Sequence, residues 1–127
     1  MAIFVLKPFD KNLKGTDIND DKIRQAAREV TAGCYEANLG GHVYKKRIPL
    51  AAGKSGGARA VIVFKLEQHL FFVNGYAKSS AKKSGKEISD SELDAYRRVA
   101  ADLLAMPPET VARAIAAGKM REVKSDG

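Results

Sequence analysis

The sequence predicts an α+β fold with a small, mainly antiparallel β-sheet flanked by helices. Runs of β-branched and aromatic residues with period-two alternation fill the middle of the chain, from Val43 to Ala77. Segments with helical spacing precede and follow this region. Strands and helices therefore form separate blocks, which is the pattern of an α+β architecture. The length of 127 residues fits a single domain that spans residues 1–127.

The first third of the chain predicts a strand and a helix. Residues 3–7 are predicted to form a short strand that Pro8 ends. A helix begins near Asn19 or Asp20, because either side chain can cap the first turn. Gly33 ends this helix and Gly40-Gly41 breaks the chain. The apolar residues of the helix recur on one face: Ile23, Ala26, Ala27 and Val30.

Three strands are predicted in the middle of the chain. Residues 43–48 form the first, and residues 49–57 form a loop. Residues 58–66 and 69–77 form the clearest hairpin, which turns at Glu67-Gln68. Strand side chains alternate between the two faces of a sheet. One face of residues 58–66 therefore carries Ala60, Ile62, Phe64 and Leu66, and the other carries Arg59, Val61, Val63 and Lys65.

Two further helices are predicted near the C-terminus. Ser89-x-x-Glu92 is a capping box, with Ile88 placed to pack against Leu93. The helix has an apolar stripe at Leu93, Tyr96, Ala100, Leu103 and Leu104. Met106-Pro107-Pro108 ends it, and Pro108 suits the first turn of the next helix. The apolar side of that last helix is predicted at Val111, Ala112 and Ile115, and Gly118 ends it.

The sequence Gly53-Lys54-Ser55 raises the question of a nucleotide-binding loop. That motif requires a glycine five residues before the glycine of Gly-Lys-Ser, a preceding strand and a following helix. Ile48 occupies the glycine position, and residues 58–64 read as a strand. The P-loop interpretation therefore fails.

Cysteine and hydropathy give expectations about compartment. Cys34 is the only cysteine and cannot form an intrachain disulfide, so we expect it to be a small buried residue. The apolar run of residues 2–6 is too short for a signal peptide or a membrane span. We expect a cytoplasmic protein without a membrane partner.

The positive charge is concentrated in one third of the chain. The net charge is +7, and residues 45–86 contain ten Lys and Arg residues but only one acidic residue, Glu67. This segment therefore carries +9, and the rest carries −2. A localised basic surface is typical of a nucleic-acid partner. A solvated face that aids solubility is the alternative, above all for Lys82, Lys83 and Lys86 in a Ser/Gly-rich loop.

Some of these cations are predicted to converge. Alternation puts Lys45 and Arg47 on one face, and Lys46 on the other with Tyr44 and Ile48. Arg59 opens the next strand and Lys78 closes the hairpin. If the strands are neighbours in the sheet, several of Lys45, Arg47, Arg59 and Lys78 lie together.

Such a cluster suits RNA cleavage by the ribose 2′-hydroxyl. Cations gathered without carboxylates lower one another's pKa, so a lysine could accept a proton near neutral pH. Arginines neutralise the charge that develops on the phosphate. DNA lacks the attacking hydroxyl. The candidate catalytic residues are Lys45, Arg47, Arg59 and Lys78, and the candidate RNA- or ribosome-binding residues are Lys46, Lys54, Tyr76, Lys82 and Lys83.

No metal or cofactor is expected. His42 and His69 are isolated in the sequence, and strand-edge packing or exposure is the expected role of each. Tyr44 and Tyr76 could stack on bases, although a place at the edge of the core is the expected role.

Four segments together resemble a known family: LGGHVYKKRI, GKSGGARAVIVF, FFVNGYAKS and LDAYRRVAADLLAM. They are similar to the RelE-type toxins of type II toxin–antitoxin systems, closest to a HigB-like subgroup with two extra C-terminal helices. The resemblance spans residues 3–123. Its most specific parts are the Lys-x-Arg strand, the Ser-Gly-Gly-x-Arg start of the hairpin and the Gly-Tyr-Ala-Lys end.

The resemblance implies a ribosome-dependent mRNA endonuclease that works without metal or cofactor. It also implies a cognate antitoxin, often a helix-turn-helix protein that represses its own operon. By position, Lys45 and Arg47 match the basic strand residues of the family's active site, Arg59 its phosphate-contacting arginine, and Lys78 the basic residue after the last hairpin strand. Ser79 stands where RelE itself has an arginine, and no catalytic tyrosine can be placed near the C-terminus. The general acid is therefore not assigned.

Two other classes remain open at this point. ParE-like proteins share the fold and poison DNA gyrase, but they need no phosphate site such as Lys45, Arg47 and Arg59 would form. A non-catalytic RNA- or ribosome-binding module would use the same cations only to bind phosphates, and would show salt-sensitive binding without cleavage.

Overall fold

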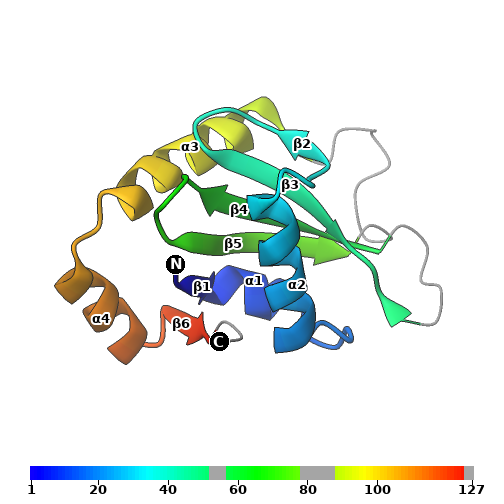
Figure 1. The fold of residues 1–127 in the computed structure, drawn as a ribbon, viewed down its shortest axis with the longest axis horizontal. Helices are drawn as coiled ribbons and strands as arrows, with labels where there is room; N and C mark the ends of the chain where they lie inside the picture. Colours follow the sequence, from blue (N-terminus) through cyan, green and yellow to red (C-terminus); the bar gives the residue numbers. More distant parts are fainter. Residues whose placement is uncertain (52–56, 78–87, 125–127) are drawn as a thin grey trace.

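Six strands and four helices make up the described part of the chain (Figure 1). The computed structural model describes residues 1–51, 57–77 and 88–124. In chain order the elements are β1 (Ile3–Leu6), α1 (Lys7–Asn12), α2 (Asp20–Thr31), β2 (Ala37–Asn38), β3 (Val43–Ile48), β4 (Ala58–Phe64), β5 (Leu70–Ala77), α3 (Asp90–Leu104), α4 (Pro108–Ala116) and β6 (Met120–Val123). The predicted α+β class is confirmed.

The strands form one sheet in the order β2-β3-β4-β5-β1-β6. Neighbouring strands are antiparallel except β1 and β5, which are parallel. The register of β4 and β5 shifts between Val61 and Ile62, where Val61 pairs with Asn74 and Ile62 with Phe72. The sheet is therefore mainly antiparallel, as predicted, with one parallel pair, β1 and β5.

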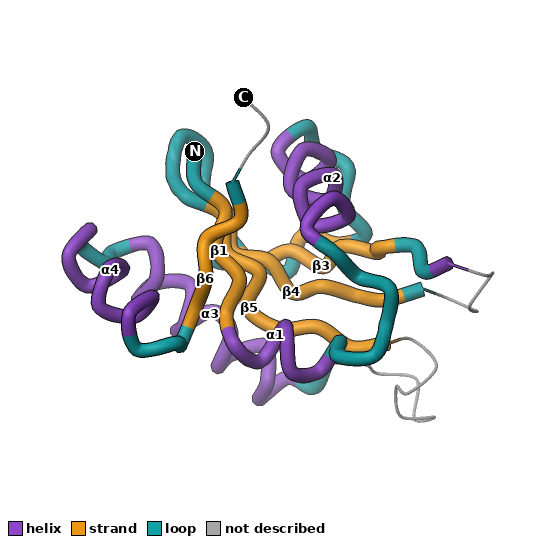
Figure 2. Tube along the Cα trace, turned by 90° about the horizontal axis from the view of Figure 1, so that it is seen from below, coloured by secondary structure: helices purple, strands orange, loops and turns teal. Residues whose placement is uncertain are grey.

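Helices cover both faces of the sheet, so β4 is buried along its whole length (Figure 2). One face packs on α1 and α2 through a core that includes Phe9, Ile23, Ile62 and Phe72. The opposite face packs on α3 and α4 through a core that includes Val61, Val63, Phe71, Ala100 and Leu103. The alternation predicted for β4 is confirmed from Ala60 to Phe64, because successive residues belong to opposite cores.

The two long helices begin where local capping signals place them. The side chain of Asn19 accepts a hydrogen bond from the backbone N–H of Lys22 at 2.9 Å and caps α2. At α3, Ser89 and Glu92 form both hydrogen bonds of the capping box. These contacts satisfy backbone N–H groups that have no partner within a helix. Both predicted helix starts are confirmed.

Three elements were not predicted. Pro8 occupies the first turn of α1, where its missing N–H costs nothing, so it opens a helix as well as ending β1. The short β2 forms a hairpin with β3. β6 follows α4 and pairs antiparallel with β1. The two late helices are thus followed by a strand that returns to the sheet.

Some burial predictions were wrong. Val111 of α4 is buried and Ala114 packs beside it, whereas Ala112 and Ile115 are exposed. Leu66 lies beyond the end of β4 and is 74% exposed, so it does not extend the apolar face. Cys34 is exposed and not buried, because the chain has left α2 there and turns at the surface. Among the described residues, no helix is long and apolar enough to cross a membrane.

Candidate functional site

The register of β3, β4 and β5 brings four predicted site residues onto one face of the sheet. Arg47 lies opposite Arg59, and Arg59 lies opposite Tyr76. Directly opposed residues of antiparallel strands project from the same face of the sheet. Lys45 lies two residues before Arg47 and therefore shares that face. We call Lys45, Arg47 and Arg59 the cationic row, and Tyr76 borders it on β5.

The cationic row occupies the end of the face that α3 covers. Val43 and Val61 continue the same face into the core beneath α3. Arg59 is 7% exposed, the one buried charged residue of the described part of the chain. Arg47 is exposed. The predicted convergence of Lys45, Arg47 and Arg59 is thus seen in the structure, with Arg59 at the back and Arg47 at the surface.

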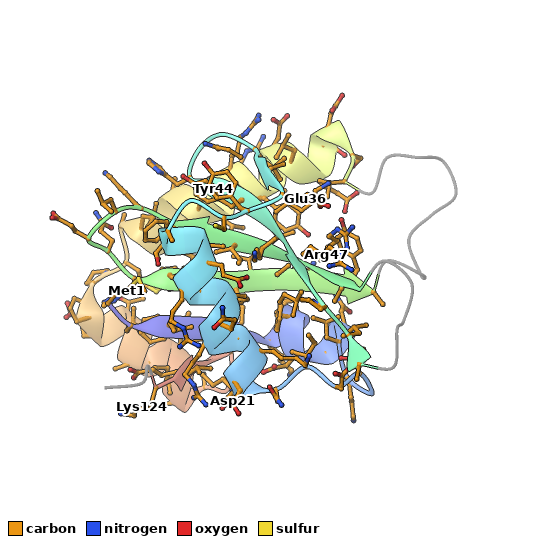
Figure 3. All side chains as sticks on the ribbon, turned by 45° about the vertical axis from the view of Figure 1, so that its right-hand side comes forward. Met1, Asp21, Glu36, Tyr44, Arg47 and Lys124 are labelled. Carbon is orange, nitrogen blue, oxygen red and sulfur yellow. The ribbon has the colours of Figure 1, made fainter. Side chains whose placement is uncertain are left out.

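A carboxylate lies within this row. Both oxygens of Glu36 accept hydrogen bonds from Nε of Arg59, at 2.9 and 3.1 Å. Nζ of Lys45 lies 3.4 Å from Oε1 of the same carboxylate. In Figure 3, Glu36 and Arg47 both lie along β3, to the right of α2. The idea that these cations gather without carboxylates was therefore wrong, because Glu36 comes from outside the basic segment.

Charge and burial act in opposite directions on Glu36. Partial burial raises the pKa of its carboxyl, but the hydrogen bond and charge of Arg59 and the charge of Lys45 outweigh burial, so the pKa lies below its usual value. Glu36 is thus ionised at neutral pH.

Tyr76 closes the row on the β5 side. Burial is the main cause that raises the pKa of its hydroxyl to about 12. The positive charge of Arg59 acts to lower this pKa, and Glu36 acts to raise it. The Tyr76 hydroxyl is therefore protonated at neutral pH and can donate a hydrogen bond.

Asn74 and Tyr96 border the row beneath α3. The side-chain amide of Asn74 donates to the hydroxyl of Tyr96 at 3.0 Å, and Asn12 donates to the Asn74 carbonyl oxygen at 2.7 Å. Burial raises the pKa of Tyr96. These contacts fix α1, β5 and α3 around one end of the site.

Lys46 lies on the opposite face, as predicted, and does not join the row. Its Nζ lies 2.8 Å from Oε1 of Glu29, and its side chain is 12% exposed. The hydrogen bond from Lys46 is the main cause that lowers the pKa of Glu29. Tyr44 also lies on this face, where it packs on the core and its ring lies 4.7 Å from that of Tyr35. The core-edge role expected for Tyr44 is confirmed.

Four predicted site residues lie outside the described residues: Lys54, Lys78, Lys82 and Lys83. His69 accepts a hydrogen bond from the backbone N–H of Ala2 at 3.2 Å and its ring meets that of Phe4 edge-on. Within residues 1–51, 57–77 and 88–124, no group of three or more His, Cys, Asp and Glu residues could hold a metal ion.

Gly57, two residues before Arg59, occupies a position at the start of β4 that only glycine fits without strain. Its φ of +63° is a conformation that glycine adopts without strain. A Cβ on Gly57 would lie 2.8 Å from the backbone oxygen of Ile48, which is too close. Glycine therefore lets the start of β4 approach the end of β3, so that Arg59 faces Arg47.

Glu36, Asn74 and Tyr96 are site residues that the sequence did not reveal. A signal for Glu36 was present, because Gly40-Gly41 is a turn and Val43–Ile48 a strand. If the residues before this turn pair with Val43–Ile48 as the other strand of a hairpin, Glu36 lies beside Lys45. No local pattern indicated Asn74 or Tyr96.

The fold, a mainly antiparallel six-stranded sheet with four helices, is consistent with that of RelE-like toxins. The family model described as RelE toxin of RelE / RelB toxin-antitoxin system matches residues 1–123. The chain therefore belongs to the RelE toxin family, as the resemblance in its sequence indicated. Membership implies a cognate antitoxin as partner. Neither the comparison with curated proteins nor that with solved structures gives a significant match.

Proposed function

We propose that this toxin is a metal-independent endoribonuclease that cuts mRNA in the ribosome and so inhibits translation. The observation that carries the proposal is the register that aligns Arg47 and Arg59 across β3 and β4, with Lys45 on the same face. This arrangement offers positive charge at two depths, one arginine buried and the other exposed. A phosphate of an RNA backbone is the anion that matches it.

The proposed chemistry is attack of a ribose 2′-hydroxyl oxygen on the adjacent phosphorus, with loss of its proton to solvent. The bond from phosphorus to the 5′-oxygen breaks, and that oxygen takes a proton from solvent, which leaves a 2′,3′-cyclic phosphate and a 5′-hydroxyl. Arg47 and Arg59 stabilise the charge that develops on the phosphate oxygens. Tyr76 lies opposite Arg59 and offers a hydroxyl to the same phosphate. Lys45 contacts Glu36, so we assign it to charge stabilisation together with the arginines rather than to proton abstraction. Lys78 follows β5 and belongs to the proposed site by its position in the sequence.

The proposal includes partners and a compartment. The messenger and the ribosome are the substrate assembly, which places the toxin in the cytoplasm. Lys46, Lys54, Lys82 and Lys83 are proposed contacts to RNA or ribosome, and a helix-turn-helix protein is the proposed type of antitoxin. The HigB-like branch is the proposed subgroup.

The test is primer extension on a defined messenger in a purified translation system. Arg47→Ala is the sharpest variant, because Arg47 is exposed and its truncation leaves the core intact. Arg98→Ala is the matched control, since it removes the same charge from an exposed position on α3. We expect cuts within translated codons for the wild type and for Arg98→Ala, and a loss of at least about 100-fold for Arg47→Ala.

The outcomes separate the three function classes. An intact messenger with folded wild-type protein contradicts the nuclease proposal, and gyrase inhibition then becomes the next assay. Salt-sensitive binding of the toxin to ribosomes without cleavage identifies a binding module. Equal cleavage by Arg47→Ala and Arg98→Ala shows that a nuclease site lies elsewhere.

A further inference from the structure

Glu36 is the group that links two members of the cationic row. It precedes β2, and its backbone N–H donates to the carbonyl oxygen of Lys45 at 2.8 Å. Ala37, the next residue, pairs with Lys45 in the sheet. The backbone of Glu36 is thus held against β3, and its side chain reaches across β3 to Arg59 on β4.

The contact of Glu36 with Arg59 restricts the guanidinium group. The carboxylate binds Nε through both oxygens, at 2.9 and 3.1 Å. A guanidinium is planar, so a partner fixed at Nε fixes the direction of its two terminal nitrogens. Burial of Arg59 to 7% exposure restricts the side chain further. Glu36 therefore determines how Arg59 meets an incoming phosphate.

Neutralisation of a buried charge does not account for the whole arrangement. A buried arginine needs an anionic partner, and Glu36 supplies it. The same carboxylate, however, is 33% exposed and also lies 3.4 Å from Nζ of Lys45, a second residue of the row. One carboxylate thus sets the spacing of two cations that would otherwise repel each other.

The negative charge of Glu36 weakens RNA binding, although the same carboxylate holds Arg59 and Lys45 in place. A carboxylate next to the cationic row lowers the positive potential that attracts phosphate. Glu36 therefore costs some affinity for RNA while it holds Arg59 and Lys45 in place. These two effects predict that binding and cleavage respond in opposite directions when the charge is removed.

We propose that Glu36 is a positioning residue of the RNA-cleavage site, which orients Arg59 and Lys45 toward the scissile phosphate at the expense of ground-state RNA binding. This role rests on the proposed nuclease function. It is distinct from a role in folding alone, because it predicts a lower cleavage rate without weaker binding.

Glu29 provides a matched control within the same strand neighbourhood. It also binds a lysine of β3, Lys46, through a carboxylate oxygen at 2.8 Å, but on the opposite face of the sheet. Glu29→Gln and Glu36→Gln change the net charge equally. A difference in cleavage between the two variants therefore reflects the position of the carboxylate and not the overall charge.

The experiment is single-turnover cleavage of messenger in programmed ribosomes with wild type, Glu36→Gln, Glu36→Asp and Glu29→Gln. The saturating rate and the half-saturating toxin concentration are measured separately, and thermal unfolding verifies that each variant is folded. We expect Glu36→Gln to lower the saturating rate by about 10- to 100-fold, as small misplacements of reacting groups do. Its half-saturating concentration should be equal to or lower than that of the wild type. Glu36→Asp keeps the charge and should recover part of the rate, and Glu29→Gln should stay within about twofold of the wild type.

Each other outcome overturns the proposal. A Glu36→Gln rate within about twofold of the Glu29→Gln rate shows that Glu36 does not position the site. A higher half-saturating concentration with an unchanged rate shows that Glu36 serves binding instead. If Glu36→Gln is unfolded and Glu36→Asp has the wild-type rate and affinity, the role is structural. Absence of cleavage by the folded wild type overturns the nuclease function first, and this role with it.

Discussion

The Glu36–Arg59 contact predicts a measurable coupling in stability. The side chain of Arg59 is 8% exposed and that of Glu36 is 33% exposed. Hydrogen bonds to charged groups contribute about 1.5–3 kcal/mol, whereas exposed ion pairs contribute about 0–1 kcal/mol. Because one partner is buried and the other is one-third exposed, we expect a coupling free energy of about 1.5–2 kcal/mol.

A double-mutant cycle measures this coupling. Urea unfolding gives the free energy of unfolding of the wild type, Glu36→Ala, Arg59→Met and the double variant. Methionine keeps much of the buried aliphatic volume of Arg59 and removes its charge. The same cycle with Glu29→Ala and Lys46→Met serves as comparison, and it should give a smaller coupling, about 0.5–1 kcal/mol, since only one contact joins that more exposed pair.

Two results would refute the reasoning. A coupling below about 0.5 kcal/mol would show that Glu36 does not hold Arg59 in the folded protein. A coupling no larger than that of Glu29 with Lys46 would show that burial of Arg59 adds nothing to the contact. Either result would also remove the structural basis of the positioning role.

Two further predictions concern the hairpin start and acid. Gly57→Ala places a side chain on a left-handed backbone, with its Cβ 2.8 Å from the Ile48 oxygen. It should lower the free energy of unfolding by about 1–3 kcal/mol and reduce cleavage. A midpoint of urea unfolding equal to that of the wild type contradicts this prediction. The pKa values of Glu29 and Glu36 in the folded protein lie below the ordinary value of 4.5, so the folded state binds fewer protons than the unfolded state. The free energy of unfolding therefore falls as the pH drops below about 4.5. Thermal unfolding between about pH 3 and 5 should show a smaller loss of stability with falling pH for Glu36→Gln than for the wild type. Parallel curves for the two proteins would contradict a lowered pKa of Glu36.

The proposed RNA site depends on few residues, and the structure shows which contacts support them. Arg47 and Arg59 face each other because β3 and β4 pair in the register Arg47↔Arg59. Gly57 permits the close approach of the two strands. The RNA site proposed here is therefore a property of the hairpin and its register, with α3 as the cover of the adjoining face.

Local signals in the sequence were sufficient for much of the fold. The caps at Asn19 and Ser89 depend on residues within one helical turn, so they could be read directly. Alternation along Val43–Ile48 and Ala58–Phe64 likewise placed Lys45, Arg47 and Arg59 on their faces. Neighbours in sequence determine these features, because capping and side-chain alternation act over a few residues.

Only the tertiary structure decided the long-range contacts. The parallel pairing of β1 with β5 and the return of β6 to β1 join segments that are far apart in the chain. In α4, Val111 and Ala114 face the core rather than Ala112 and Ile115, because the position of the sheet selects the buried side of a short helix. Glu36 belongs to the site for the same reason. The Gly40-Gly41 turn was a sequence signal for the hairpin, but only the folded β2–β3 hairpin brings the Glu36 carboxylate to Arg59.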